Sequence, residues 1–146
     1  LFSNLAAFGV VGVVEKQSGS LEISMYKGLY STNPKISIVM MLAMFSLAGI
    51  APFAGFFSKM FVFAAAAGEG YYILVLIAAL NVIISLYYYL RIVKAMFIDK
   101  TEKPLPAFFS NRWHRISLVI CTIGILFTGM LNIVFHIIEK YSFGIN

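Results

Sequence analysis

Long apolar runs separated by short polar segments dominate this chain. Residues 36–67, 71–90 and 116–138 each reach the length of about 20 mostly apolar residues that a helix needs to cross a hydrocarbon core about 30 Å thick. Residues 1–14 are also apolar, although a helix of that length covers only about 21 Å. The pattern predicts a single membrane domain over 1–146, an all-α polytopic transmembrane bundle with helices near 1–14, 36–67, 71–98 and 114–138.

The second apolar run contains a poor sequence for continuous helix at its middle. Gly49 and Gly55 lower helix propensity, and Pro52 between them lacks the N–H that would bond back to the preceding turn. A continuous helix over 36–67 would be about 48 Å long, which exceeds the hydrocarbon thickness. We therefore expect one discontinuous helix, broken near 48–54, whose open backbone is buried in protein or lines a watery cavity.

Lys59 is the one charged residue in the range 36–68. A lysine at the centre of a membrane helix costs about 2.5–3.5 kcal/mol on insertion scales, so it suggests a function. Burial disfavours the charged form of an amine and a nearby carboxylate favours it, so such a lysine can act as a reversible proton carrier. The alternative is a lysine that snorkels to the headgroups. Gly55 and Ala66 near it on one helix face favour an inward-packed side chain.

A polar face on the third predicted helix is the candidate partner surface. Asn81, Ser85 and Tyr88 recur at spacings of four and three residues, which places them on one side of a helix. Such residues commonly form hydrogen bonds between membrane helices. They could equally form a polar wall that organises water beside Lys59, and the two interpretations are compatible.

Charge is sparse and unevenly distributed. The chain is 61% hydrophobic and 12% charged, against about 25% charged residues in soluble domains. If the four predicted helices alternate in direction, the segments 15–35 and 91–115 share one side and hold most of the basic residues: Lys16, Lys27, Lys35, Arg91, Lys94, Lys100, Lys103, Arg112 and Arg115. Basic loops face the cytoplasm or matrix, so the C-terminus is expected on the outer side. The net charge of +5 then follows from orientation, and no nucleic-acid partner is expected.

Several kinds of site are not expected in this chain. Cys121 is the single cysteine, so an internal disulfide cannot form, and zinc or iron–sulfur ligand sets are missing from the sequence. We find no nucleophile with its base, no phosphate-binding loop and no haem or flavin motif, so metal and cofactor binding by this chain are not predicted. Because the sequence begins within an apolar run and without Met, we interpret it as the C-terminal part of a larger membrane protein.

Two motifs resemble a known family. Residues 45–59 read FSLAGIAPFAGFFSK and closely resemble the signature of the antiporter-like subunits of respiratory complex I and the related multisubunit sodium–proton antiporters. Residues 80–93 read LNVIISLYYYLRIV and are similar to subunit N of NADH–quinone oxidoreductase, called subunit 2 in mitochondria. The opening residues 4–11 also fit, so the resemblance extends over nearly the whole chain.

The resemblance implies a function that the residues alone do not give. It implies a proton-translocating membrane-arm subunit of NADH–quinone oxidoreductase in a bacterial inner membrane or the mitochondrial inner membrane. NADH, FMN, iron–sulfur clusters and quinone would bind in partner subunits, and other membrane-arm subunits and the lipid bilayer would surround the chain. Lys59 would match the family's lysine near the proton exit. The alternatives are a sodium/proton antiporter subunit, and a structural membrane subunit in which Lys59 only snorkels.

Overall fold

A computed structural model of the chain describes residues 1–101, 104–108 and 112–142, with the side chains of 54 and 132–142 excepted. These residues form helices and no strand, which confirms the all-α prediction. In chain order the elements are α1 (Phe2–Ser18), the 3-10 helix η1 (Ile23–Tyr26), α2 (Leu29–Thr32), α3 (Pro34–Ala48), α4 (Ala54–Gly68), α5 (Tyr72–Phe97) and α6 (Arg112–Ser142).

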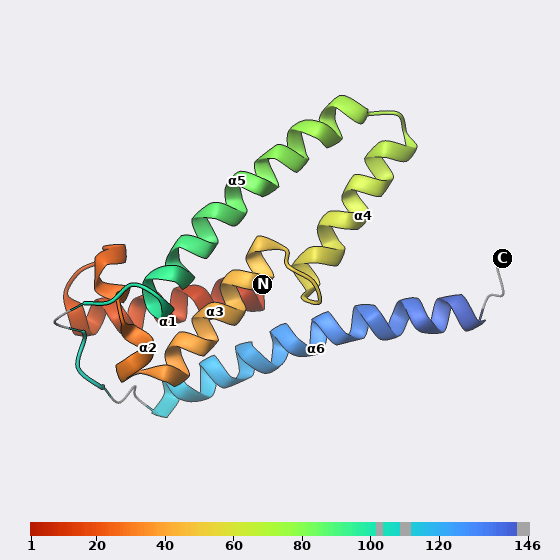
Figure 1. Cartoon of the computed structure of the whole chain (residues 1–146). Helices are drawn as coiled ribbons and strands as arrows, with labels where there is room; N and C mark the ends of the chain where they lie inside the picture. Colours follow the sequence, from red (N-terminus) through yellow and green to blue (C-terminus); the bar gives the residue numbers. More distant parts are fainter. Residues whose placement is uncertain (102–103, 109–111, 143–146) are drawn as a thin grey trace.

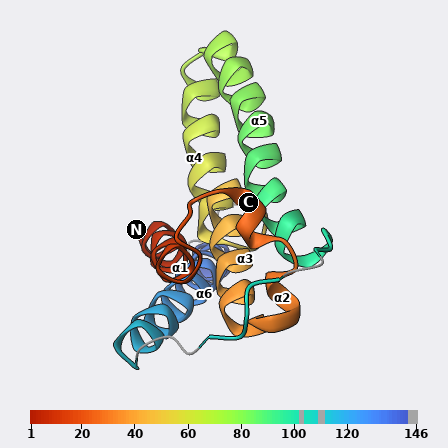
Figure 2. The same ribbon diagram turned by 90° about the vertical axis from the view of Figure 1, so that its left-hand side faces the viewer.

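Three helices make the packed body of the molecule. α1 lies against α3 and α6, while α4 and α5 form a hairpin that projects away from them (Figures 1 and 2). The buried apolar core lies mainly between α1, α3 and α6 and also includes residues at one end of α5. Its members include Ala6, Val10, Val14, Met40, Ala43, Met44, Met96, Leu118, Cys121 and Ile125. Small residues in this set allow the helix backbones to approach closely, as is typical of membrane helix interfaces.

The first helix extends further than the apolar pattern indicated. The predicted helix ended near residue 14, but α1 continues through Glu15, Lys16 and Gln17 to Ser18, because these polar residues are good helix formers. It ends where Gly19 adopts a left-handed conformation with φ 69°. The segment 15–34, which lies between the first two predicted helices, contains the short helices η1 and α2.

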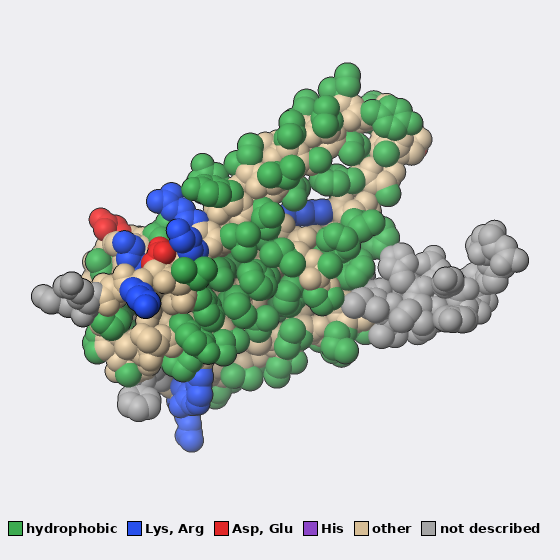
Figure 3. Space-filling model, viewed as in Figure 1, with side chains coloured by type: hydrophobic (Ala, Val, Ile, Leu, Met, Phe, Trp, Pro, Cys, Tyr) green, Lys and Arg blue, Asp and Glu red, His purple; other side chains and the backbone are tan. Residues whose placement is uncertain are grey.

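Among the described residues, two helices are long and apolar enough to cross a bilayer by length and composition. They are α5, over Tyr72–Phe97, and the Arg112–Leu131 part of α6, while the helices Pro34–Ala48 and Gly55–Gly68 are apolar but shorter. The apolar 18-residue stretch of α5 that is long enough to span contains no residue buried within the described chain. Figure 3 shows hydrophobic side chains over the α4–α5 hairpin and Lys and Arg side chains gathered mainly at the opposite end of the molecule.

The predicted second helix is observed as two separate helices of 15 residues each. α3 ends at Ala48, α4 begins at Ala54, and the residues between them are not helical. In Figure 1 the chain doubles back briefly after α3, and α4 then leads away into the hairpin. The reading of α3 and α4 as halves of one discontinuous transmembrane helix stays a prediction.

Candidate functional site at the end of α3

The end of α3 has a well-defined stop signal. Gly49 lies in the left-handed region with φ 82°, a conformation that glycine adopts without the strain of a side chain. Its N–H donates to Ser46 O at 3.2 Å, and the N–H of Ile50 donates to Phe45 O at 3.0 Å. This pair of bonds is a Schellman motif, which satisfies two carbonyls of the last helical turn. The next two carbonyls, of Leu47 and Ala48, are left pointing out of the helix end.

Lys59 binds those two carbonyls from the second turn of α4. Its Nζ donates to Ala48 O at 2.8 Å and to Leu47 O at 3.1 Å. The ammonium thus lies at the C-terminus of α3, where the partial charges of the free carbonyls are negative and favour a cation. The side chain is half-buried rather than extended toward the end of α4. Lys59 therefore connects the two helices across the break.

Both predicted glycines at the break lie where a larger side chain would collide. A Cβ on Gly49 would lie 2.9 Å from Lys59 Cδ and 3.0 Å from its Nζ. A Cβ on Gly55 would overlap the carbonyl oxygen of Ser46. The two glycines let α4 approach the end of α3 closely enough for the lysine to reach its carbonyls. Pro52 lies in the non-helical stretch between them.

A partly buried pair of hydroxyl groups lies one turn before the break, and it was not predicted from the sequence. Ser3 Oγ of α1 donates to Ser46 Oγ of α3 at 2.8 Å, and Ser46 is buried. The available signal was a serine in each of two apolar helices, but serine in a membrane helix also bonds within its own helix, so the pairing could not be inferred. The contact extends the polar surroundings of the break toward α1.

The predicted polar face on α5 is not joined to Lys59 within the described chain. Ser85 Oγ donates to Asn81 O of its own helix at 2.8 Å. Asn81 is exposed, and Tyr88 is 60% exposed with its ring packed edge-on against Tyr87. The structure thus brings Lys59 together with α3, whereas Asn81, Ser85 and Tyr88 lie on an open surface of α5.

The surroundings of Lys59 contain no carboxylate partner among the residues that the structure describes. An ion pair is observed away from Lys59, near the C-terminal end of α5, where Lys94 Nζ lies 3.8 Å from Asp99 Oδ1. Within the same described ranges, no three His, Cys, Asp or Glu side chains group together as a metal site requires. The site is therefore an amine held by backbone carbonyls, an arrangement suited to holding or passing a proton.

Comparisons with known proteins give the family. The family model described as NADH:quinone oxidoreductase/Mrp antiporter, transmembrane, matches residues 1–85 and so includes α1, the break and Lys59. NADH-quinone oxidoreductase subunit N of Azobacteroides pseudotrichonymphae is 57% identical over 99% of this chain and 31% of its own length. The subunit of the same name from Phocaeicola vulgatus is 54% identical over 94% of this chain and 29% of its own.

A solved structure agrees with this assignment. A chain of the respiratory complex I from Thermus thermophilus with bound Aureothin is similar, with a TM-score of 0.69 at 28% sequence identity. The match covers 90% of this chain and 31% of that one. Our chain thus spans about a third of the length of the curated relatives that it matches. It is an integral membrane protein chain and belongs to the NADH:quinone oxidoreductase/Mrp antiporter transmembrane family.

Proposed function

We propose that this chain is part of a proton-translocating membrane-arm subunit of an NADH–quinone oxidoreductase, in which Lys59 carries the proton. The observation that carries the proposal is the Lys59 ammonium, which bonds to the carbonyls of Leu47 and Ala48 at the break between two apolar helices. Family membership and the names of the relatives support the wider assignment. The activity of the whole protein is part of the proposal, because the chain spans about a third of those relatives.

In this proposal α3 and α4 are two halves of one discontinuous transmembrane helix. Non-helical backbone at membrane depth requires polar partners that lipid cannot supply. The Schellman bonds and the Lys59 ammonium supply them for the last turn of α3. Water that reaches the remaining backbone groups of the break would then also reach the lysine.

Proton transfer follows from the balance of forces on the amine. The free carbonyls at the end of α3 favour the ammonium form, and removal from water disfavours it. A positive charge arriving nearby, or the loss of a negative one, would release the proton, and the reverse change would take it up. The polar residues Asn81, Ser85 and Tyr88 would order the water that connects Lys59 to the bulk, in the assembled protein.

The orientation and the partners complete the proposal. The basic segments 15–35 and 91–115 face the cytoplasm or matrix, and the C-terminus lies on the outer side of a bacterial or mitochondrial inner membrane. Other membrane-arm subunits and lipid surround the chain, while NADH, FMN, iron–sulfur clusters and quinone bind in partner subunits. Electron transfer there would be coupled electrostatically to the protonation of Lys59.

The second candidate function is a subunit of a multisubunit sodium/proton antiporter. One observation favours keeping it: the matching family includes the Mrp antiporters as well as the oxidoreductases. The same lysine would then exchange protons against sodium without any electron transfer.

The test uses the full-length protein in its native assembly, reconstituted into liposomes. Under the proposal, Lys59→Met lowers proton uptake per NADH oxidised while the assembly stays intact on native gels. Lys27→Met, which removes an exposed lysine outside the break, leaves the ratio unchanged. Full pumping by an intact Lys59→Met assembly contradicts the role of the lysine. Proton movement driven by a sodium gradient without NADH would favour the antiporter.

A further inference from the structure

A groove opens between the start of α3 and the start of α6, remote from the break. Its volume is about 470 Å³, within the range of about 300–1,000 Å³ that small-molecule sites occupy. Side chains of both helices and of the preceding linkers line it, among them Lys35, Ile36, Val39, Arg115, Leu118 and Val119. The groove thus combines cationic and apolar walls.

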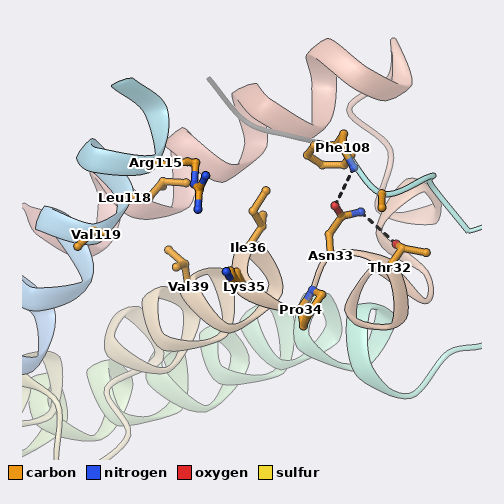
Figure 4. Close-up of a pocket in the computed structure, with 11 residues that line it drawn as sticks. Thr32, Asn33, Pro34, Lys35, Ile36, Val39, Phe108, Arg115, Leu118 and Val119 are labelled. Carbon is orange, nitrogen blue, oxygen red and sulfur yellow. Dashed lines mark hydrogen bonds between the residues drawn. The ribbon is translucent and has the colours of Figure 1, made fainter. Parts of the chain in front are cut away.

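Two cationic groups face the groove from different helices. Figure 4 shows Lys35 on α3 and Arg115 on α6, with their nitrogens directed toward the same space. Both side chains are exposed, and neither forms an ion pair with a residue that the structure describes. A guanidinium binds two oxygens of a phosphate side by side, and an ammonium adds a point charge. The open end of the groove is therefore suited to a phosphate group.

The opposite end of the groove is closed by hydrogen bonds around the buried side chain of Asn33. Asn33, 7% exposed, donates from Nδ2 to Thr32 Oγ1 at 3.0 Å and to Pro106 O at 3.2 Å. Its Oδ1 accepts the N–H of Phe108 at 3.1 Å. These bonds hold residues 106–108 against the start of α3, so that Phe108 forms a wall of the groove (Figure 4). The groove is a structured feature of the fold.

The apolar walls continue along α6 toward the membrane interior. Arg115, Val119, Ile123 and Leu126 share one helix face by their spacing, and the three apolar residues are exposed. From Arg115 to Leu126 the helix rises about 16 Å, close to the hydrocarbon thickness of one leaflet, about 15 Å. An exposed Trp113 at the start of α6 is typical of the membrane–water boundary. In a bilayer, the phosphate end of the groove would thus lie at headgroup level.

We propose that this groove binds an anionic glycerophospholipid, with its phosphate between Lys35 and Arg115 and an acyl chain along Val119, Ile123 and Leu126. Charge complementarity and the length of the apolar stripe select this occupant. A free phosphate has no acyl chain to contact the apolar stripe, and a zwitterionic lipid is attracted less strongly by two cationic side chains. The groove lies on the basic side of the molecule, where anionic lipids attract lysine and arginine.

The test measures lipid binding by the full-length protein in its native assembly. After delipidation in detergent, the protein is titrated with dioleoylphosphatidylglycerol or dioleoylphosphatidylcholine, and bound lipid is counted by native mass spectrometry. We expect phosphatidylglycerol to bind more tightly, and the double variant Lys35→Gln/Arg115→Gln to weaken it about 30-fold, as expected for two basic residues at an anionic surface. Lys16→Gln/Lys27→Gln removes the same charge on the same side and should leave the affinity unchanged.

Four results would overturn the proposal. The first is that both double variants lower the affinity for phosphatidylglycerol equally, and the second is that phosphatidylglycerol binds no more tightly than phosphatidylcholine. The third is that inorganic phosphate displaces bound phosphatidylglycerol, and the fourth is that no lipid binds because another protein segment fills the groove. A further variant keeps both charges: Val119→Trp should also lower phosphatidylglycerol affinity by obstructing the acyl path. Unchanged affinity in Val119→Trp contradicts that path, and matching thermal unfolding of all variants establishes that each is folded.

Discussion

Replacing Lys59 by Met removes the ammonium and keeps an unbranched side chain of similar length, so apolar packing changes little. The variant loses the hydrogen bonds from Nζ to Leu47 O at 3.1 Å and Ala48 O at 2.8 Å. A buried bond to a charged group contributes about 1.5–3 kcal/mol, but Lys59 is half-buried, and hydrogen bonds between membrane helices average about 0.6 kcal/mol. Two such bonds and the interaction with the end of α3 give an expected loss of about 1–2 kcal/mol in the free energy of unfolding.

The assay is reversible unfolding of the full-length protein in mixed micelles of detergent and dodecyl sulfate. Lys27→Met is the matched control, because Lys27 is exposed and lies outside the break, and it should change the free energy of unfolding by less than about 0.5 kcal/mol. A snorkelling lysine gives a different result, since its replacement by an apolar residue is harmless or stabilising. Unfolding of Lys59→Met at or above the wild-type free energy would therefore refute the capping of α3 by this side chain.

Three further predictions concern the geometry around the site and the linkers. Gly55→Ala places a methyl group against a carbonyl of α3 and should cost about 1–3 kcal/mol in the same unfolding assay, unlike Gly68→Ala, whose position is open. Asn33→Ala removes the hydrogen bonds to Pro106 O and from the N–H of Phe108 and should cost about 1–3 kcal/mol, with faster proteolysis near these residues. Burial first, and the Glu15 carboxylate second, raise the pKa of Tyr26 above 10.0 in the folded protein. The stability that protonated Tyr26 contributes is therefore fully present below about pH 10 and is lost as pH rises through the folded-state pKa. Tyr26→Phe should remove this loss of stability at alkaline pH, as measured by spectrophotometric titration and unfolding.

The helices could be predicted from the sequence because membrane helices have simple requirements. Long apolar runs predict them, and Gly49 with Pro52 predicts where α3 stops, since neither residue can continue the helical hydrogen-bond pattern without cost. The polar C-terminal end of α1 was not predicted, because the boundary was placed where the apolar run ends and helix propensity was not considered. Residues Glu15–Ser18 favour helix until Gly19 ends it.

The sequence was enough to identify Lys59 as the candidate site residue, but not the contacts that its side chain makes. An isolated lysine in an apolar run identifies Lys59, yet the pattern does not say that its side chain reaches back to Ala48 and Leu47. The bond between Ser3 and Ser46 joins residues 43 positions apart, and only the packing of α1 on α3 brings them together. Asn33 and Phe108, 75 positions apart, likewise meet only because the linkers fold against each other.

The most direct test of the central claim restores the amine chemically. In the full-length assembly with accessible background cysteines replaced, Lys59→Cys should pump fewer protons per NADH oxidised. Treatment with aminoethyl methanethiosulfonate attaches an amine of nearly lysine length at that position, and it should restore pumping, whereas methyl methanethiosulfonate, which adds no amine, should not. Full pumping by the unmodified Lys59→Cys variant, or equal recovery with both reagents, would contradict a proton carried by the amine at the end of α3.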